Sequence, residues 1–289
     1  MTDIAQVIGR TLVKSDAEVE AEAALYLKTR ARLVLAFRIG LLAVLLIGWE
    51  LAARLEFIDP FFFAMPSQIF WRLADWINKG TSLGPLWFQV LVTMEEAIIG
   101  FFAGSIAGII AGIALGRNRF AADVFAIYIK IANAIPRIVL APIFIMAFGL
   151  GLASKVAVAF VMVFFVVFAN AFQGVREADR AMIANAQILG ASKWDVTRSV
   201  VVPSALSWIF ASLHVSFGFA IVGAVVGELL GSRSGIGQLI AIAQGSFDSP
   251  GVFAGMVVLV VVAMTADYAM STLERKIVRW RPTPMQETN

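Results

Sequence analysis

Residues 97–116 read AIIGFFAGSIAGIIAGIALG, a run of twenty residues without Asp, Glu, Lys or Arg. At roughly 1.5 Å per helical residue such a run is about 30 Å long, which matches the hydrocarbon thickness of a bilayer. Glycine recurs at every fourth position, so the glycines share one face of the helix. Small residues let helix backbones approach closely in lipid, and the stripe therefore predicts a packing seam, with a sliding seam as the alternative to static packing. The stripe consists of Gly100, Gly104, Gly108, Gly112 and Gly116.

Five further apolar runs predict an all-α membrane protein with about six transmembrane helices. Three of them, residues 156–175, 199–227 and 249–266, also lack Asp, Glu, Lys and Arg. Residues 33–49 form another run, which has one arginine near its start. The last run, residues 124–150, contains two basic residues and two prolines, and prolines interrupt a regular helix.

The composition supports a membrane protein and excludes several other classes. Hydrophobic residues make up 60% of the 289 residues, whereas soluble domains usually contain about 45–50%. The absence of cysteine excludes disulfides and thiolate chemistry. The net charge of +3 does not indicate nucleic-acid binding, because cytoplasmic loops rich in Lys and Arg produce the same balance in membrane proteins.

The distribution of Lys and Arg predicts that both termini lie in the cytoplasm. With six spans and an inner N-terminus, fifteen basic residues fall on the inner side and five on the outer side, in agreement with the positive-inside rule. The inner set is Arg10, Lys14, Lys28, Arg30, Arg32, Arg117, Arg119, Arg176, Arg180, Lys193, Arg198, Arg275, Lys276, Arg279 and Arg281. The outer set is Arg54, Arg72, Lys79, Lys155 and Arg233. Trp71 and Trp76, in the outer segment 56–87, are expected at the membrane interface.

The ends of the chain are expected to lie outside the bilayer. Residues 1–32 predict a charged cytoplasmic helix, which Ser15 and Glu18 would begin as a capping box. This helix is interpreted as a solvated element at the membrane face, with docking on a partner as the alternative. Residues 33–281 then form the transmembrane domain, and residues 282–289 a short tail.

The longest cytoplasmic loop, about residues 176–203, has the pattern of two helices joined by a sharp bend. Residues 184–195 read ANAQILGASKWD. Gly190 can adopt the left-handed conformation that ends a helix. Ser192 can cap the next helix, with Asp195 three residues further on. A bent pair of helices with small side chains suits insertion into a groove of a partner, although an ordinary loop is the alternative.

These residues carry a resemblance to a known family. The pattern Ala-x-Ala-x-x-x-Gly-Ala at residues 184–191, with Pro203 thirteen residues after the glycine, resembles the EAA loop of ABC importer permeases. Three further segments resemble the nitrate/sulfonate/taurine-type branch, namely MPS at 65–67, PRIVLAP and FGLG within 136–151, and GE and GIG within 227–237. One departure is that Ala184 stands where the family's motif has its glutamate, so the loop would dock by shape.

The resemblance implies a type I ABC importer permease in the bacterial inner membrane. Its implied partners are a separate ATP-binding cassette ATPase, a second copy of the permease in a homodimer, and an extracytoplasmic solute-binding protein. The implied ATPase-coupling residues are Ala184, Asn185, Ala186, Gly190, Ala191 and Ser192.

The sequence predicts no catalytic or cofactor site of its own. It contains no Gly-x-x-x-x-Gly-Lys-Ser/Thr, the loop that cradles phosphates in many ATPases. ATP and Mg²⁺ are therefore expected on the partner ATPase, and this chain is not expected to be an enzyme. A single histidine and scattered carboxylates do not suggest a metal or hydrolytic site.

Polar residues within the spans are candidates for lining a route through the membrane. His214, Gly218 and Glu228 fall on roughly the same face of the fifth span. A histidine hydrogen-bonded between helices is the alternative for the first of them.

The third span offers Asn133 and Arg137 as further candidates for the pathway. Arg137 lies seven residues after Lys130, so the two share a helical face and could attract an anion. The alternative is that both side chains extend to the interface or pair with Glu95 or Glu96.

The sequence as a whole predicts the transmembrane subunit of an ATP-driven importer that works by alternating access. The resemblance implies a small solute, either an anion such as nitrate, a sulfonate or taurine, or a vitamin-like precursor. The alternative is an ion-coupled transporter or channel that relays protons through Glu228, His214 or Asp267. The absence of an evident inverted repeat favours the importer.

Overall fold

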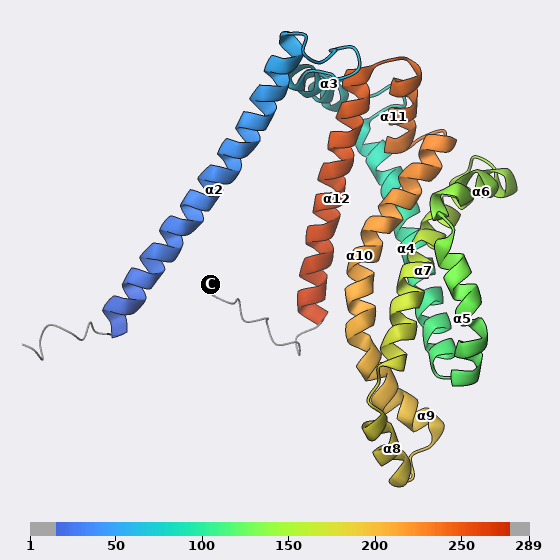
Figure 1. Cartoon of the computed structure of the whole chain (residues 1–289). Coiled ribbons are helices and arrows are strands. Elements are labelled where there is room, and N and C mark those ends of the chain that lie inside the picture. Colours follow the sequence, from blue (N-terminus) through green and yellow to red (C-terminus); the bar gives the residue numbers. More distant parts are fainter. Residues whose placement is uncertain (1–15, 278–289) are drawn as a thin grey trace, which may run out of the picture. The chain divides into compact units, whose positions relative to one another are not determined.

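The computed structural model describes residues 16–277, and this part of the chain consists of helices joined by turns (Figure 1). An isolated β-bridge between Thr81 and Gly84 is the one piece of β-structure in the described range. The chain divides into two compact units, Met1–Ser67 and Gln68–Asn289, each described by itself.

The first unit is dominated by α2 (Asp16–Arg54), a single helix of 39 residues. At 1.5 Å per residue it is roughly 58 Å long, well beyond the thickness of a bilayer. The expected charged helix and the first span are therefore continuous, because neither Gly nor Pro occurs between residues 16 and 39 to interrupt them. The predicted Ser15 cap lies outside the described residues.

Glu50 holds the end of the first unit together. Its carboxylate accepts hydrogen bonds from the Ser67 backbone N–H at 3.0 Å and the Ser67 hydroxyl at 2.8 Å. It also pairs with Arg54, one helical turn away, at 2.8 Å. Ser67 of the MPS segment thus closes the turn that follows α2.

The second unit contains the remaining helices, and α3 begins just before its boundary. In chain order these are α3 (Pro66–Asn78), α4 (Leu86–Gly116), α5 (Arg119–Ala134), the 3₁₀ turn η1 (Arg137–Leu140), α6 (Ala141–Phe148), α7 (Leu152–Arg176), α8 (Arg180–Ile188), α9 (Lys193–Val196), the π-helical turn η2 (Thr197–Val201), α10 (Val202–Leu230), α11 (Ile236–Gly245) and α12 (Ser249–Ile277).

Within the described range, five helices are long and apolar enough to cross a membrane, and a bent pair would make a sixth. The bent pair corresponds to the predicted span 124–150, whose two halves meet at 83°. Pro136 causes this bend, because it lacks a backbone N–H and disfavours helical geometry in the preceding residue. Ile135 is accordingly extended, with φ −73° and ψ 123°.

The core of the second unit is the packing of α4, α7 and α10. A Cβ atom built on Gly104 would lie 2.7 Å from the Phe160 carbonyl oxygen, and one on Gly112 would lie 2.7 Å from the Ala171 Cβ. On the other side of α7, a Cβ on Gly223 of α10 would lie 2.6 Å from an α7 backbone atom. Glycines therefore bring both neighbouring helices against α7.

The turn between α11 and α12 lies at one end of the bundle, next to α3 (Figure 1). Asp248 in this turn pairs with Arg72 of α3 at 3.0 Å and accepts the Gly251 backbone N–H at 3.1 Å. Ile236 and Ile240 of α11 pack with Val258 of α12 in a small buried cluster. The opposite end of the bundle carries α8 and α9 (Figure 1).

Candidate functional site

The loop of residues 176–203, which the sequence resemblance suggests as the coupling loop, has the bend that the sequence predicts. Asp179 caps α8 by accepting the Ala181 backbone N–H at 2.7 Å. Gly190 then adopts a φ of +86°, which confirms the predicted left-handed conformation. The N–H of Gly190 donates to the Gln187 carbonyl and the N–H of Ala191 to the Ala186 carbonyl, both at 3.0 Å. This pair of bonds is the Schellman arrangement that closes a helix on glycine.

The second half of the loop begins with the predicted capping box. The Ser192 hydroxyl accepts the Asp195 backbone N–H at 3.2 Å, and the Asp195 carboxylate accepts the Ser192 backbone N–H at 3.0 Å. The short α9 then continues through η2 into α10. Pro203 falls in the first turn of α10, where its missing N–H is tolerated, and the π-helical turn lies directly before it.

The loop presents apolar side chains to its surroundings at the tip of the bundle. Ile188 and Leu189 are 82% and 87% exposed, and Trp194 lies beneath the Arg117 guanidinium at 6.0 Å from the ring centroid. Among the expected coupling residues, Ala186 and Ala191 pack inward against the cluster that contains Val196 and Ala205. The outward face consists of Ala184, Asn185, Gly190 and Ser192, all exposed.

Two of the expected pathway residues lie on α10 near α12. His214 Nε2 is 3.2 Å from Asp267 Oδ1, so this pair joins the two helices. One turn further, Gly218 has open space around it and lines an apolar groove of about 530 Å³. Phe219 of α10 and Leu259 of α12 form part of its walls.

Two other candidates lie at the bend of the α5–α6 pair. Arg137 donates a hydrogen bond to the Asn133 side-chain oxygen at 2.9 Å. Its guanidinium also lies 5.3 Å from the centroid of the Phe165 ring. Among the described residues, Arg137 therefore meets a neutral amide and an aromatic ring rather than Glu95 or Glu96.

Glu228 is set apart from the other candidates, because it is fully buried in a polar network that sequence reasoning missed. Its Oε1 accepts the Thr93 hydroxyl and its Oε2 the Gly237 backbone N–H, both at 2.7 Å. Gln89 accepts the Gly235 N–H at 2.8 Å. The GE and GIG segments are the sequence feature that could have indicated this network, because a glycine-flanked turn after an acidic residue suggests that backbone N–H groups meet the carboxylate.

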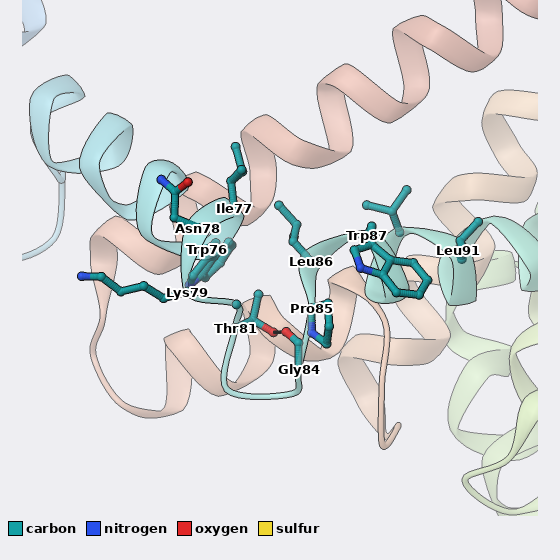
Figure 2. A pocket seen from close by; sticks show the side chains of 12 residues that line it. Trp76, Ile77, Asn78, Lys79, Thr81, Gly84, Pro85, Leu86, Trp87 and Leu91 are labelled. Atoms are coloured by element: carbon teal, nitrogen blue, oxygen red, sulfur yellow. Dashed lines mark hydrogen bonds between the residues drawn. The ribbon is translucent and has the colours of Figure 1, made fainter.

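A hollow of about 860 Å³ lies at the turn between α3 and α4 (Figure 2). Trp76 and Trp87 line it from the two sides of the turn, with Lys79 beside them (Figure 2). Thr81 stiffens the turn, since its hydroxyl donates to the Gly84 carbonyl at 2.7 Å. Among the residues that the structure describes, the hollow included, no group of three or more His, Asp or Glu side chains could hold a metal ion.

The apolar helices define an integral membrane protein, with the bent, exposed loop at one end of its bundle. Residues 104–279 match the family described as "Binding-protein-dependent transport system inner membrane component". This match covers more than half of the chain, which therefore belongs to that family, the inner-membrane permeases of ABC importers.

Relatives and solved structures agree with this family. The riboflavin transport system permease protein RibX of Chloroflexus aurantiacus is 34% identical over 83% of this chain and 88% of its own length. The taurine transport system permease protein TauC of Escherichia coli is 28% identical over 84% of this chain and 88% of its own length. In an inward-facing structure of the MetNI methionine ABC transporter, one chain is similar over 67% of this chain and 96% of its own length, with a TM-score of 0.59 and 19% identity. That likeness confirms the type I permease fold.

Proposed function

We propose that this permease subunit of an ABC importer moves its solute by alternating access, driven by ATP hydrolysis on a separate ATPase. The observation that carries this proposal is the geometry of the coupling loop. Its bend is fixed by the left-handed Gly190 and by the Ser192–Asp195 capping box. A rigid bend that exposes Ile188 and Leu189 suits insertion into a groove of a partner.

Motion of the loop would reach the spans by two routes. The helical path from α9 through η2 into α10 is continuous, so a displacement of the loop would move α10 directly. The stacking of Arg117 on Trp194 links the loop to the end of α4. The absence of the family's glutamate, replaced by Ala184, places more of the contact on the exposed apolar side chains.

The remaining partners follow from the family. A second copy of this chain would complete the pore, and an extracytoplasmic binding protein would deliver the solute, in the inner membrane of a bacterium. The hollow at Trp76 and Trp87 lies at the end of the bundle opposite the coupling loop, which is where such a delivery would occur.

The solute that we propose is a small anion of the taurine or sulfonate kind, or a vitamin-like compound. The relatives named for taurine and riboflavin transport support both possibilities. Arg137 would attract an anion, whereas the apolar groove at Gly218 would suit a ring or short alkyl chain. Thermal-shift measurement of the cognate binding protein against a panel of solutes would decide between them.

The test of the mechanism is uptake by reconstituted vesicles that contain the permease, its ATPase and the binding protein. Uptake should require ATP on the side of the ATPase and should survive ionophores that abolish ion gradients. The ion-coupled alternative predicts the reverse dependence. Glu228 gives that alternative no support, because it is fully buried, is hydrogen-bonded to Thr93 and Gly237, and does not line the apolar groove at Gly218.

A further inference from the structure

The turn that joins α11 to α12 contains a phenylalanine in an unfavourable backbone conformation. Phe247 has a φ of +54°, in the left-handed region that residues with bulky side chains rarely adopt. In the part of the chain that the structure describes, the one other non-glycine residue with a positive φ is Glu56, in the first unit. Such a conformation persists only where the surrounding structure holds it in place.

The hydrogen bonds of this turn have the same pattern as those at the end of α8. The Phe247 N–H donates to the Gln244 carbonyl at 3.2 Å, and the Asp248 N–H donates to the Ala243 carbonyl at 2.8 Å. At the end of α8 the equivalent position is Gly190, and glycine is the residue that this arrangement favours. Phe247 therefore occupies a position at which glycine would fit without strain.

Asp248 fixes the turn directly after Phe247. Its carboxylate pairs with Arg72 of α3 at 3.0 Å and accepts the Gly251 backbone N–H at 3.1 Å. It also fills the space beside Gly251, where a Cβ would lie 2.4 Å from the Asp248 Oδ2. Because the backbone is held both before and after Phe247, the direction in which its side chain leaves the turn is fixed as well.

The side chain of Phe247 is 72% exposed, so burial within the chain offsets little of the strain. Its neighbours in the sequence are polar, namely Ser246, Asp248 and Ser249. The ion pair of Arg72 and Asp248 is itself partly exposed beside it. Charged groups are costly within hydrocarbon, so this turn belongs in water rather than in lipid. A rigid turn thus presents an aromatic ring in polar surroundings.

We propose that Phe247 is an anchor for the extracytoplasmic binding protein, which docks on the α11–α12 turn. The proposal rests on the proposed function and names the surface that this partner would contact. The family to which the chain belongs is described as binding-protein-dependent, and the turn lies at the end of the bundle opposite the coupling loop (Figure 1). The matching surface of the partner would be an apolar pocket with a polar rim, because the ring stands beside the ion pair of Arg72 and Asp248.

The strain at Phe247 has a physical use in this role. Aromatic residues are enriched at protein interfaces, where a few buried side chains supply most of the binding energy. A side chain that is already held in one direction loses less conformational entropy when it binds. A strained residue that a glycine could replace is therefore kept for binding at a cost in stability.

The first test is Phe247→Gly in the full permease, purified with its ATPase. Glycine relieves the left-handed strain, so the Tm should equal or exceed that of the wild type. The affinity for the purified binding protein of the same system should fall by about tenfold or more, together with the stimulation of ATP hydrolysis by that protein. Phe120→Gly is the matched control and should keep full affinity, because Phe120 is 79% exposed at the start of α5.

The outcomes of this test separate the proposal from the proposed function. A lower Tm for Phe247→Gly would show that the ring supports the fold, and an unchanged affinity would show that it is no anchor. Either result would overturn the proposal alone. A wild-type permease whose ATP hydrolysis does not respond to the binding protein would overturn the proposed function, and this proposal with it.

Labelling of Ser246→Cys identifies what covers the turn while Phe247 stays in place. The chain contains no other cysteine, and Ser246 is exposed. In membrane vesicles the thiol should react from the outer side with a membrane-impermeant maleimide. Saturating binding protein should slow this reaction by about tenfold or more, whereas albumin should not. A thiol that does not react even without binding protein would indicate that lipid covers the turn. That result would overturn the proposal, as would a rate that the binding protein leaves unchanged.

Discussion

The Cβ atom of Ala159 lies where a side chain on Gly100 would have to be: a Cβ built on Gly100 would be 2.4 Å from it. The same α7 residue also faces Gly223 of α10, whose Cβ would lie 2.6 Å from the Ala159 Cα. One alanine is therefore pressed between two glycines on different helices. This triple contact explains why position 100 has no side chain, and the other four glycines of the α4 stripe meet α7 residues nearly as closely.

Gly108→Leu should separate α4 from α7. A Cβ at this position would already lie 2.9 Å from the Phe164 carbonyl oxygen and 3.0 Å from the Phe168 backbone nitrogen, and neither backbone atom can move aside easily. We expect a loss of roughly 1–3 kcal/mol or more, seen as a lower Tm and a lower yield. Gly40→Leu is the matched control, since Gly40 has nothing within 4 Å. Equal stability of the two variants would contradict a tight seam.

Lys155→Met should destabilise the permease, because the fully buried Lys155 ammonium donates to the Leu150 carbonyl oxygen, which would lose its partner. Leaving a buried acceptor without its hydrogen bond costs roughly 1–3 kcal/mol. Lys79→Met provides the control, because Lys79 is exposed and its pair with Asp75 is an i,i+4 surface contact. Such a pair is worth less than about 1 kcal/mol. Thermal unfolding of both variants in detergent measures the difference.

The local features of this fold were predictable, because the residues that make them lie within a few positions of each other. The glycine stripe depends on a spacing of four, and the bend at Gly190 and the Ser192–Asp195 capping box depend on three or fewer residues. Each of these patterns acts through near neighbours on one helix or turn. The bend of the loop at residues 176–203 was therefore predictable, whereas its role in coupling was not settled by the pattern.

The buried network was not predictable in the same way. Thr93 meets Glu228 across 135 positions of sequence, and Gln89 meets Gly235 across 146. Only the packing of α4 against α10 brings them together, so hydropathy patterns place Glu228 on a helical face without revealing its partners. The expected face of His214, Gly218 and Glu228 is accordingly divided in the structure.

The orientation of the chain is open to a direct test, because it contains no cysteine. Single cysteines at Lys79 and Lys193 should label from opposite sides of the membrane, with Lys193 reacting only from the cytoplasm. The two residues lie at opposite ends of the second unit, on the α3–α4 side and at the start of α9. Both are exposed, so neither should be shielded from a membrane-impermeant reagent. Labelling of Lys193→Cys from outside would contradict the inner position of the coupling loop.

Arg137→Gln should reduce uptake of an anionic solute more than it reduces stability. The side chain contacts neutral Asn133 and the ring of Phe165, so no buried anion is left unpaired when the charge is removed. We expect a loss of uptake of about tenfold, equivalent to roughly 1.4 kcal/mol, with a Tm shift of only a few degrees. Lys130→Gln is the control, because Lys130 is exposed on α5; the bend at Pro136 separates it from Arg137, so the two do not share the helical face that their spacing predicts. Parallel losses of uptake and stability in Arg137→Gln would indicate a structural role instead.

Leu189→Ser and Gly190→Val test the coupling loop from two directions. Leu189 is 87% exposed, so serine there removes apolar contact surface for the ATPase without disturbing the fold. Gly190 has a φ of +86°. A β-branched valine at this position would be strained, so the bend itself should change. Both variants should insert normally, yet lose ATPase co-purification and ATP-driven uptake by tenfold or more, about 1.4 kcal/mol of contact energy.

Ala186→Trp is a less selective test than the sequence suggests, because Ala186 packs inward against the loop's own cluster. Met146→Ser, equally exposed at 87% but on α6, should retain both activities. Normal uptake by Leu189→Ser and Gly190→Val, or uptake by the wild type without ATP, would contradict the proposed coupling and favour the ion-coupled alternative.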